Sequence, residues 1–119
     1  MGITSGGTVG LVVAAGRGER AGGSRPKQYR RIAGEALVAR AAAGLLAHPR
    51  VDAVAVIIGP GQETLYHEAC GHLRLLDSIE GGQERQDSVR LGLESLSARA
   101  PERVLIHDAA RPFLPPAVV

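Results

Sequence analysis

The sequence predicts an α/β fold in which helices cover both faces of a mostly parallel sheet. Two short, valine-rich runs without charged residues, 9–14 and 53–58, are each closed by glycine. Such runs are typical of strands that are buried on both faces. Segments with helical spacing alternate with these and further strand candidates, which is the pattern of a parallel α/β sheet. At 119 residues, the chain is one domain or a piece of one.

The first predicted unit is a strand, a long loop and a helix. Val9–Ala14 is the first strand, because it is short, apolar and rich in valine. Residues 15–34 contain five glycines and many charges, so we expect a long loop with at most one turn of helix. Loops of this length inside compact domains are usually functional. Leu37–Ala47 is rich in alanine and leucine and ends just before Pro49, which predicts a helix.

The next unit repeats this order. Ala53–Ile58 is the second strand, and the glycines and proline at 59–61 predict a turn. A helix is expected over 62–70. Leu73–Ile79 is the candidate for the third strand.

The last unit follows a turn at Gly81-Gly82. Apolar residues recur at helical spacing over 84–97, and Arg103–His107 is the fourth strand candidate. The two arginines of this helix, Arg85 and Arg90, are expected to be solvated or ion-paired. The final residues resemble the start of another helix, and a parallel sheet needs both faces covered. We therefore expect the sequence to be part of a longer domain.

Composition argues against nucleic-acid and membrane binding. The net charge is +2, and one Phe and two Tyr leave little surface on which bases can stack. No apolar run approaches the ~18–20 residues needed to span a bilayer. The single cysteine, Cys70, excludes an internal disulfide and fits a reducing, cytoplasmic location.

The glycine-rich stretch after the first strand has two competing interpretations. Its letters GRGERA, at 16–21, match part of the dinucleotide-binding fingerprint. However, two glycines and a proline soon after prevent the long helix that this fingerprint opens, and the second strand is not followed by an acid. An NAD(P)-dependent Rossmann oxidoreductase is therefore the less favoured alternative.

A loop that holds a nucleoside triphosphate explains the same residues better. The backbone N–H groups of Gly16 and Gly18 can approach phosphate oxygens without a side chain in the way. Arg20 and Lys27 add two positive charges. Nucleotidyl transfer depends mainly on positioning and charge stabilisation, so these residue types suit it. An exposed basic loop without a ligand is the remaining alternative.

The expected topology brings a carboxylate to the same place. In the common doubly wound order, the first and fourth strands are neighbours where the order reverses, and ligands bind beyond their carboxyl ends. Asp108 follows the fourth strand and is expected to face the glycine loop, where it can bind Mg²⁺ or a substrate hydroxyl. A loop-capping role for Asp108 is equally compatible with its position.

Three stretches of the sequence resemble, in order and spacing, the 2-C-methyl-D-erythritol 4-phosphate cytidylyltransferase family: AAGRGERAGGSRPKQY, GGQERQDSVRLGL and HDAARPF. The resemblance runs from Gly10 to Pro112. It implies a Rossmann-like nucleotidyltransferase (GT-A-like) three-layer fold, truncated after the fourth strand, with 9–119 as the CTP-binding, N-terminal part of the domain. The N-terminal residues 1–8 are themselves expected to form a flexible tail. The resemblance also implies that the substrate phosphate attacks the α-phosphorus of CTP, with Mg²⁺ or another divalent cation, in non-mevalonate isoprenoid biosynthesis.

The resemblance implies roles for individual residues. Arg20 and Lys27 are the catalytic pair that stabilises the transition state. The CTP-binding positions are Ala14, Ala15, Gly16, Gly18, Gly81, Gly82 and Ser88, of which the last three lie at the cytosine edge. The substrate or metal side is formed by Asp108, Ala109 and Arg111, with Asp108 as the candidate metal ligand.

Several alternatives stay open on the sequence. The family's catalytic domain is longer than this chain, and its second half supplies residues that position the substrate phosphate and an arm that pairs two subunits. The resemblance thus implies a homodimer through a region beyond Val119, and it leaves the activity of the 119 residues alone undecided. Some bacterial members continue into a fused cyclodiphosphate synthase domain. The Ala109-Ala110 pair favours methylerythritol phosphate over ribitol 5-phosphate, and a non-catalytic nucleotide-binding module is the further alternative.

Overall fold

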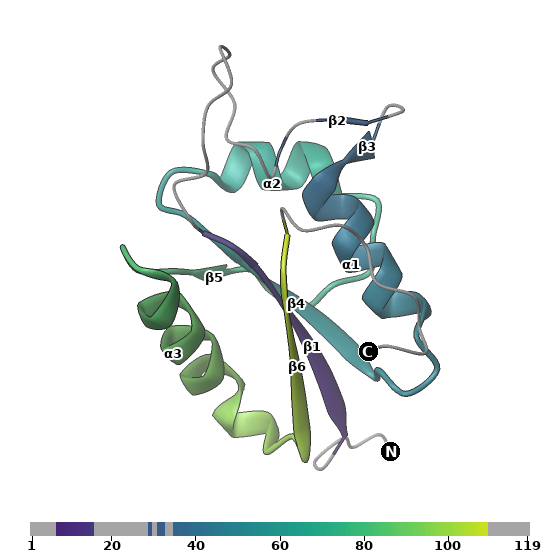
Figure 1. The fold of residues 1–119 in the computed structure, drawn as a ribbon, viewed down its shortest axis with the longest axis vertical. Helices are drawn as coiled ribbons and strands as arrows, with labels where there is room; N and C mark the ends of the chain where they lie inside the picture. The colour runs from purple at the N-terminus through teal and green to yellow at the C-terminus, as the bar shows by residue number, and fades with distance from the viewer. Residues whose placement is uncertain (1–6, 16–28, 30, 33–34, 110–119) are drawn as a thin grey trace.

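The computed structural model of the chain describes residues 7–15, 29, 31–32 and 35–109. A central sheet is sandwiched between helices, with α1 (Leu37–Ala47) and α2 (Glu63–Cys70) over one face and α3 (Arg85–Leu96) over the other (Figure 1). The predicted three-layer α/β architecture is therefore confirmed. Within the described part of the chain, no helix has both the length and the apolar character needed to cross a bilayer.

Four strands form the central sheet. They are β1 (Thr8–Ala14), β4 (Ala53–Ile58), β5 (Ile79–Glu80) and β6 (Arg103–Asp108). Their spatial order is β5-β4-β1-β6, and every neighbouring pair is parallel. The first and fourth predicted strands are thus neighbours, which confirms that the strand order reverses at β1.

The valine-rich strands are buried on both faces, as predicted. In β1, Val12 packs toward α1 and α2, whereas Leu11 packs toward α3. In β4, Val56 and Ile57 divide in the same way, and all four side chains are completely buried. Burial of side chains of this size stabilises a fold by about 1.5–3 kcal/mol each relative to exposure. These two strands therefore form a rigid centre from which the loops at their carboxyl ends project.

The helices lie close to their predicted positions. The bounds of α1 are those predicted from its alanine- and leucine-rich sequence, and α2 starts one residue later than expected. The third helix covers Arg85–Leu96 and continues as one 3₁₀ turn at Ser97–Arg99. Composition, turn residues and, for α3, helical spacing were thus sufficient to locate all three helices.

The third strand was predicted too long. Only Ile79–Glu80 pairs with β4, and the preceding residues 71–78 are not a strand. A backbone bond from Leu76 N–H to Val54 O at 2.9 Å ties this segment to the sheet. Its leucines are half-buried, because Leu73 and Leu75 pack against the α1/α2 side and Leu76 against the α3 side. Their apolar character is thus satisfied by packing, without a continuous ladder.

The prediction of an irregular loop over 15–34 missed a short pair of strands at its end. Arg31–Ile32 (β2) and Glu35–Ala36 (β3) form a short antiparallel ladder immediately before α1. A ladder of two residues is too short to show the apolar–polar alternation that predicts a strand, so the sequence pattern could not locate it. The first strand also starts one residue before the predicted position, at Thr8.

Tyr29 anchors the region between the glycine loop and α1. Its side chain is 1% exposed and belongs to the core on the α1/α2 side. Burial, reinforced by nearby Cys70 and Tyr66, raises the pKa of the Tyr29 phenol. Among the described residues, the buried hydroxyl has no hydrogen-bond partner. The ring rather than the hydroxyl therefore stabilises this position.

Replacing Tyr29 with Phe removes a buried hydroxyl that has no hydrogen-bond partner in the described part of the chain. The free energy of unfolding is therefore expected to stay unchanged or to rise, by at most about 3 kcal/mol. Replacing Tyr29 with Ala is expected to cost about 3–5 kcal/mol, because it leaves a cavity. Urea unfolding followed by circular dichroism measures both. A clear loss of stability in Tyr29→Phe would reveal a hydroxyl partner and contradict this interpretation.

Candidate active site

The carboxyl ends of β1 and β6 bring together residues that lie almost a hundred positions apart in the sequence. Val13 is in register with Asp108, and the backbone N–H of Ala109 donates to Val13 O at 2.9 Å. Ala14, the last residue of β1, and Ala15, the first residue of the glycine-rich loop, therefore lie beside Asp108 and Ala109. This adjacency was predicted from the topology, and it occurs at the switch point where α/β sheets bind ligands.

A second group of candidate residues forms a tight turn between β5 and α3. The hydroxyl of Ser88 accepts a hydrogen bond from Gly82 N–H at 3.1 Å and donates to Gly82 O at 3.5 Å. The Ser88 side chain is buried, with 1% exposure. Its hydroxyl therefore fixes the turn to the first turns of α3.

Gly81 stands where three elements meet. Its N–H donates to Ile58 O at 2.8 Å, so the turn is fastened to the end of β4. A Cβ at this position would lie 2.5 Å from Ser88 Oγ and 2.6 Å from Ala15 Cβ. Both distances are shorter than van der Waals contact permits, so only glycine fits here without displacement. The turn therefore packs directly against the start of the glycine loop.

An ion pair connects this turn to the end of β6. Arg85 Nε donates to Asp108 Oδ1 at 2.9 Å, and the side chains are 58% and 23% exposed, respectively. Arg85 is the first residue of α3, three positions after Gly82. The prediction that Arg85 and Arg90 are solvated or ion-paired is confirmed, but the sequence did not identify Asp108 as the partner of Arg85.

The structure thus gathers one part of the predicted site. Ala14, Ala15, Gly81, Gly82, Ser88, Asp108 and Ala109 all lie at or beside the carboxyl edge of the sheet, on or next to the ends of β1, β5 and β6 and the start of α3. The remaining predicted positions, Gly16, Gly18, Arg20, Lys27 and Arg111, lie outside the described residues.

One carboxylate at this edge, Asp108, is a candidate ligand for a cation that is shared with a phosphate. Among the described residues, no three His, Cys, Asp or Glu side chains gather into a protein-only metal cage. Mg²⁺ needs none, because it commonly binds one or two carboxylates together with substrate phosphates and water. Asp108, half-buried at a strand end, is a carboxylate of this kind.

A separate cavity of about 400 Å³ lies under the C-terminal half of α2. It is lined by part of α2 and by residues 71–78, and it contains none of the predicted site residues. The candidate active site is therefore defined by the strand ends and the turn at Gly81-Gly82.

A family model and curated relatives identify one family. Residues 8–119 match the family model described as IspD: 2-C-methyl-D-erythritol 4-phosphate cytidylyltransferase. The chain is 53% identical over 109 residues to the bifunctional enzyme IspD/IspF of Rhizorhabdus wittichii, covering 92% of this chain and 28% of that protein. It is also 53% identical over 110 residues to the bifunctional enzyme IspD/IspF of Rhodospirillum rubrum, covering 92% and 29%.

Solved structures support the same fold. The crystal structure of a 4-diphosphocytidyl-2C-methyl-D-erythritol synthase superposes with a TM-score of 0.74 at 26% identity, covering 94% of this chain and 50% of that one. The corresponding synthase of Anaerococcus prevotii superposes with a TM-score of 0.71 at 20% identity, which supports the fold alone. The chain spans less than a third of these curated relatives and about half of the matched crystal-structure chains.

Proposed function

The chain belongs to the 2-C-methyl-D-erythritol 4-phosphate cytidylyltransferase family, and from this premise we propose that the protein transfers the cytidylyl group of CTP to methylerythritol phosphate. The products are CDP-methylerythritol and pyrophosphate, and the reaction belongs to non-mevalonate isoprenoid biosynthesis. The observation that carries the proposal is the family match over residues 8–119, which includes the whole switch point formed by β1, β6 and the Gly81-Gly82 turn.

The chemistry that we propose needs little acid–base catalysis. An oxygen of the substrate phosphate forms a bond to the α-phosphorus of CTP, and the bond from that phosphorus to the bridging oxygen of pyrophosphate breaks. Because the attacking phosphate is already ionised, no side chain has to remove a proton. The protein's task is to orient the two phosphates and to stabilise the charge that develops, which we assign to Arg20 and Lys27.

The Gly81-Gly82 turn is proposed to bind the cytosine base. Backbone amides of glycines can approach a base edge closely, because no side chain intervenes. The Ser88 hydroxyl, which contacts both the N–H and the C=O of Gly82, holds this backbone in one conformation. Recognition of the base therefore depends on a turn that is rigid before the nucleotide binds.

Asp108 and Ala109 are proposed to line the side of the site that binds the substrate phosphate and a divalent cation, with Arg111 as a further candidate. A bound Mg²⁺ supplies positive charge that offsets the charge of the triphosphate. We propose Asp108 as a ligand of this ion, since it lies at the end of β6 in register with the end of β1. We also propose a cytoplasmic homodimer, for which the support is the family relationship.

Phosphorus NMR tests the proposed function. The longest product of the reading frame is mixed with CTP, Mg²⁺ and methylerythritol 4-phosphate, and then with ribitol 5-phosphate. Diphosphate-ester signals and pyrophosphate with the first substrate alone are expected. Signals with ribitol phosphate alone would preserve the fold and the chemistry but change the substrate. Silence with both substrates, from folded protein, would refute the proposal.

A further inference from the structure

Arg85 is a basic residue in the first turn of α3, where acidic residues are preferred. It is the first residue of α3, where the partial positive charge of the helix N-terminus disfavours a cation. Asp87, in the same turn, follows the preference for an acid. Residues that break a local rule without a local benefit are expected at functional sites. The cation at Arg85 therefore requires an explanation beyond the stability of α3.

The ion pair with Asp108 explains why a cation is present at Arg85. Arg85 Nε contacts Asp108 Oδ1 at 2.9 Å, and the two residues lie 23 positions apart, on different elements. Asp108 is the less exposed of the two side chains, at 23% against 58%. A guanidinium orients a carboxylate more strictly than an ammonium does, because its N–H groups lie in a fixed plane. The contact therefore restrains the direction of the Asp108 carboxylate.

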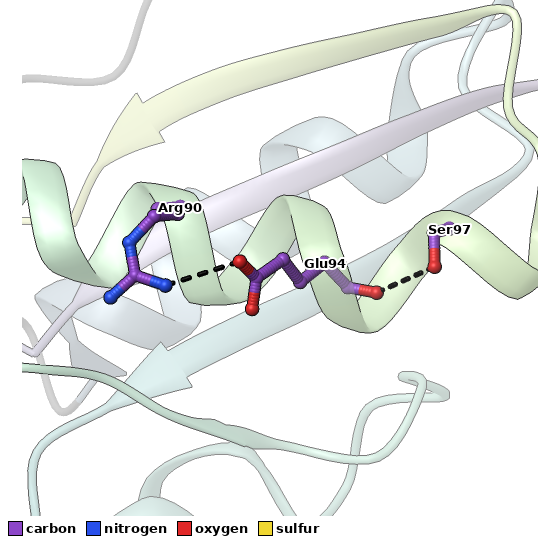
Figure 2. A network of polar contacts seen from close by, with 3 residues as sticks. All are labelled: Arg90, Glu94 and Ser97. Atoms are coloured by element: carbon purple, nitrogen blue, oxygen red, sulfur yellow. Dashed lines mark hydrogen bonds and ion pairs between the residues drawn. The ribbon is translucent and has the colours of Figure 1, made fainter.

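The same helix contains a contrasting pair. Arg90 Nη1 lies 3.1 Å from Glu94 Oε2, and Ser97 Oγ donates to Glu94 O at 2.8 Å, as Figure 2 shows. Arg90 and Glu94 are 59% and 62% exposed and stand one turn apart on α3 alone. Exposed pairs of this kind contribute little to stability. Arg90 thus provides a matched control for Arg85, with similar exposure but no connection to the candidate site.

We propose that Arg85 is a positioning residue, which holds the Asp108 carboxylate toward the Gly81-Gly82 turn and so couples the base-binding turn to the side of the site that binds substrate phosphate. This role rests on the proposed cytidylyltransferase activity. Because Arg85 lies three residues from both Gly82 and Ser88, a nucleotide bound by the turn and a phosphate bound near Asp108 are aligned through one side chain. Arg85 acts through Asp108 and need not contact the reacting atoms.

The test compares Arg85→Gln, Arg85→Lys and Arg90→Gln in the longest product of the reading frame. Initial rates are measured against CTP, methylerythritol 4-phosphate and Mg²⁺ separately, together with thermal unfolding. In Arg85→Gln, kcat/KM for methylerythritol phosphate is expected to fall about tenfold, while KM for CTP changes less than about twofold and Tm stays unchanged. Arg85→Lys is expected to recover only part of the loss, because an ammonium keeps the charge but lacks the fixed plane of N–H groups. Arg90→Gln is expected to stay within about twofold of wild type.

Three outcomes overturn the proposal. Rates of Arg85→Gln that match those of Arg90→Gln would show that the contact with Asp108 has no role in turnover. Equal losses in Arg85→Gln and Arg85→Lys, together with a lower Tm, would make Arg85 a structural residue. Wild-type protein that makes no CDP-alcohol from either alcohol phosphate would instead refute the proposed function, and this result is visible before any variant is compared.

Discussion

Replacing Lys27 with Ala is expected to lower kcat by about 10²–10³-fold, while the Kd for CTP rises only modestly. The physical reason is that charge accumulates around the α-phosphorus as the new bond forms, so a fixed cation aimed at that charge stabilises the transition state more than the ground state. Lys27 follows the glycine-rich residues 16–23 in the sequence and precedes the buried Tyr29 by two positions. Steady-state kinetics and calorimetric titration with CTP separate the two effects.

The control for Lys27 is Arg40→Ala, which removes one positive charge from an exposed position on α1. Its kcat is expected to stay close to that of wild type, since solvent and salt screen the charge of an exposed side chain. Normal turnover in Lys27→Ala would refute the catalytic role of the lysine. A loss of CTP affinity as large as the loss of kcat would instead assign Lys27 to uniform binding of the nucleotide.

Much of the fold followed from hydrophobic pattern. The valine-rich runs at β1 and β4 are buried on both faces, so they are continuously apolar and lack the apolar–polar alternation of a half-exposed strand. The helix at α1 was located by its composition and its proline stop. By contrast, the leucines at 73–76 led to the wrong prediction of a strand. They are partly buried by side-chain packing, without a continuous ladder to a neighbouring strand. Periodicity reports burial, and it cannot distinguish a ladder from a packed extended segment.

The candidate site was partly predictable for a different reason. That Ala14 and Asp108 lie near each other follows from topology, since the carboxyl ends of neighbouring parallel strands share one edge of the sheet. The Arg85–Asp108 pair did not follow, because the distance between two side chains on different elements depends on how α3 is placed over the sheet. The available signal was the cation in the first turn of a helix, where an acid is expected.

Replacing Gly81 with Ala is expected to destabilise the fold by about 1–3 kcal/mol and to weaken CTP binding by at least about tenfold. Besides Ser88 Oγ and Ala15 Cβ, the new methyl group would meet Ile57 Cγ2 at 2.8 Å. Ala15 Cβ is fixed to its backbone and Ile57 is completely buried, so neither can move aside easily. The turn itself must therefore shift, which disturbs the bond from Gly81 N–H to Ile58 O.

A second glycine separates the loss of stability from the loss of binding. Gly61, in the turn before α2, has φ of 77°, and a Cβ there would meet no heavy atom within 4 Å. Gly61→Ala is therefore expected to cost about 1–2 kcal/mol through backbone strain alone. Since this turn contains no candidate residue, CTP affinity is expected to stay unchanged in Gly61→Ala and to fall in Gly81→Ala. Urea unfolding and calorimetric titration with CTP measure the two quantities. If Gly81→Ala loses stability but binds CTP normally, the turn does not bind the cytosine base, because its backbone cannot shift and still present the same amides.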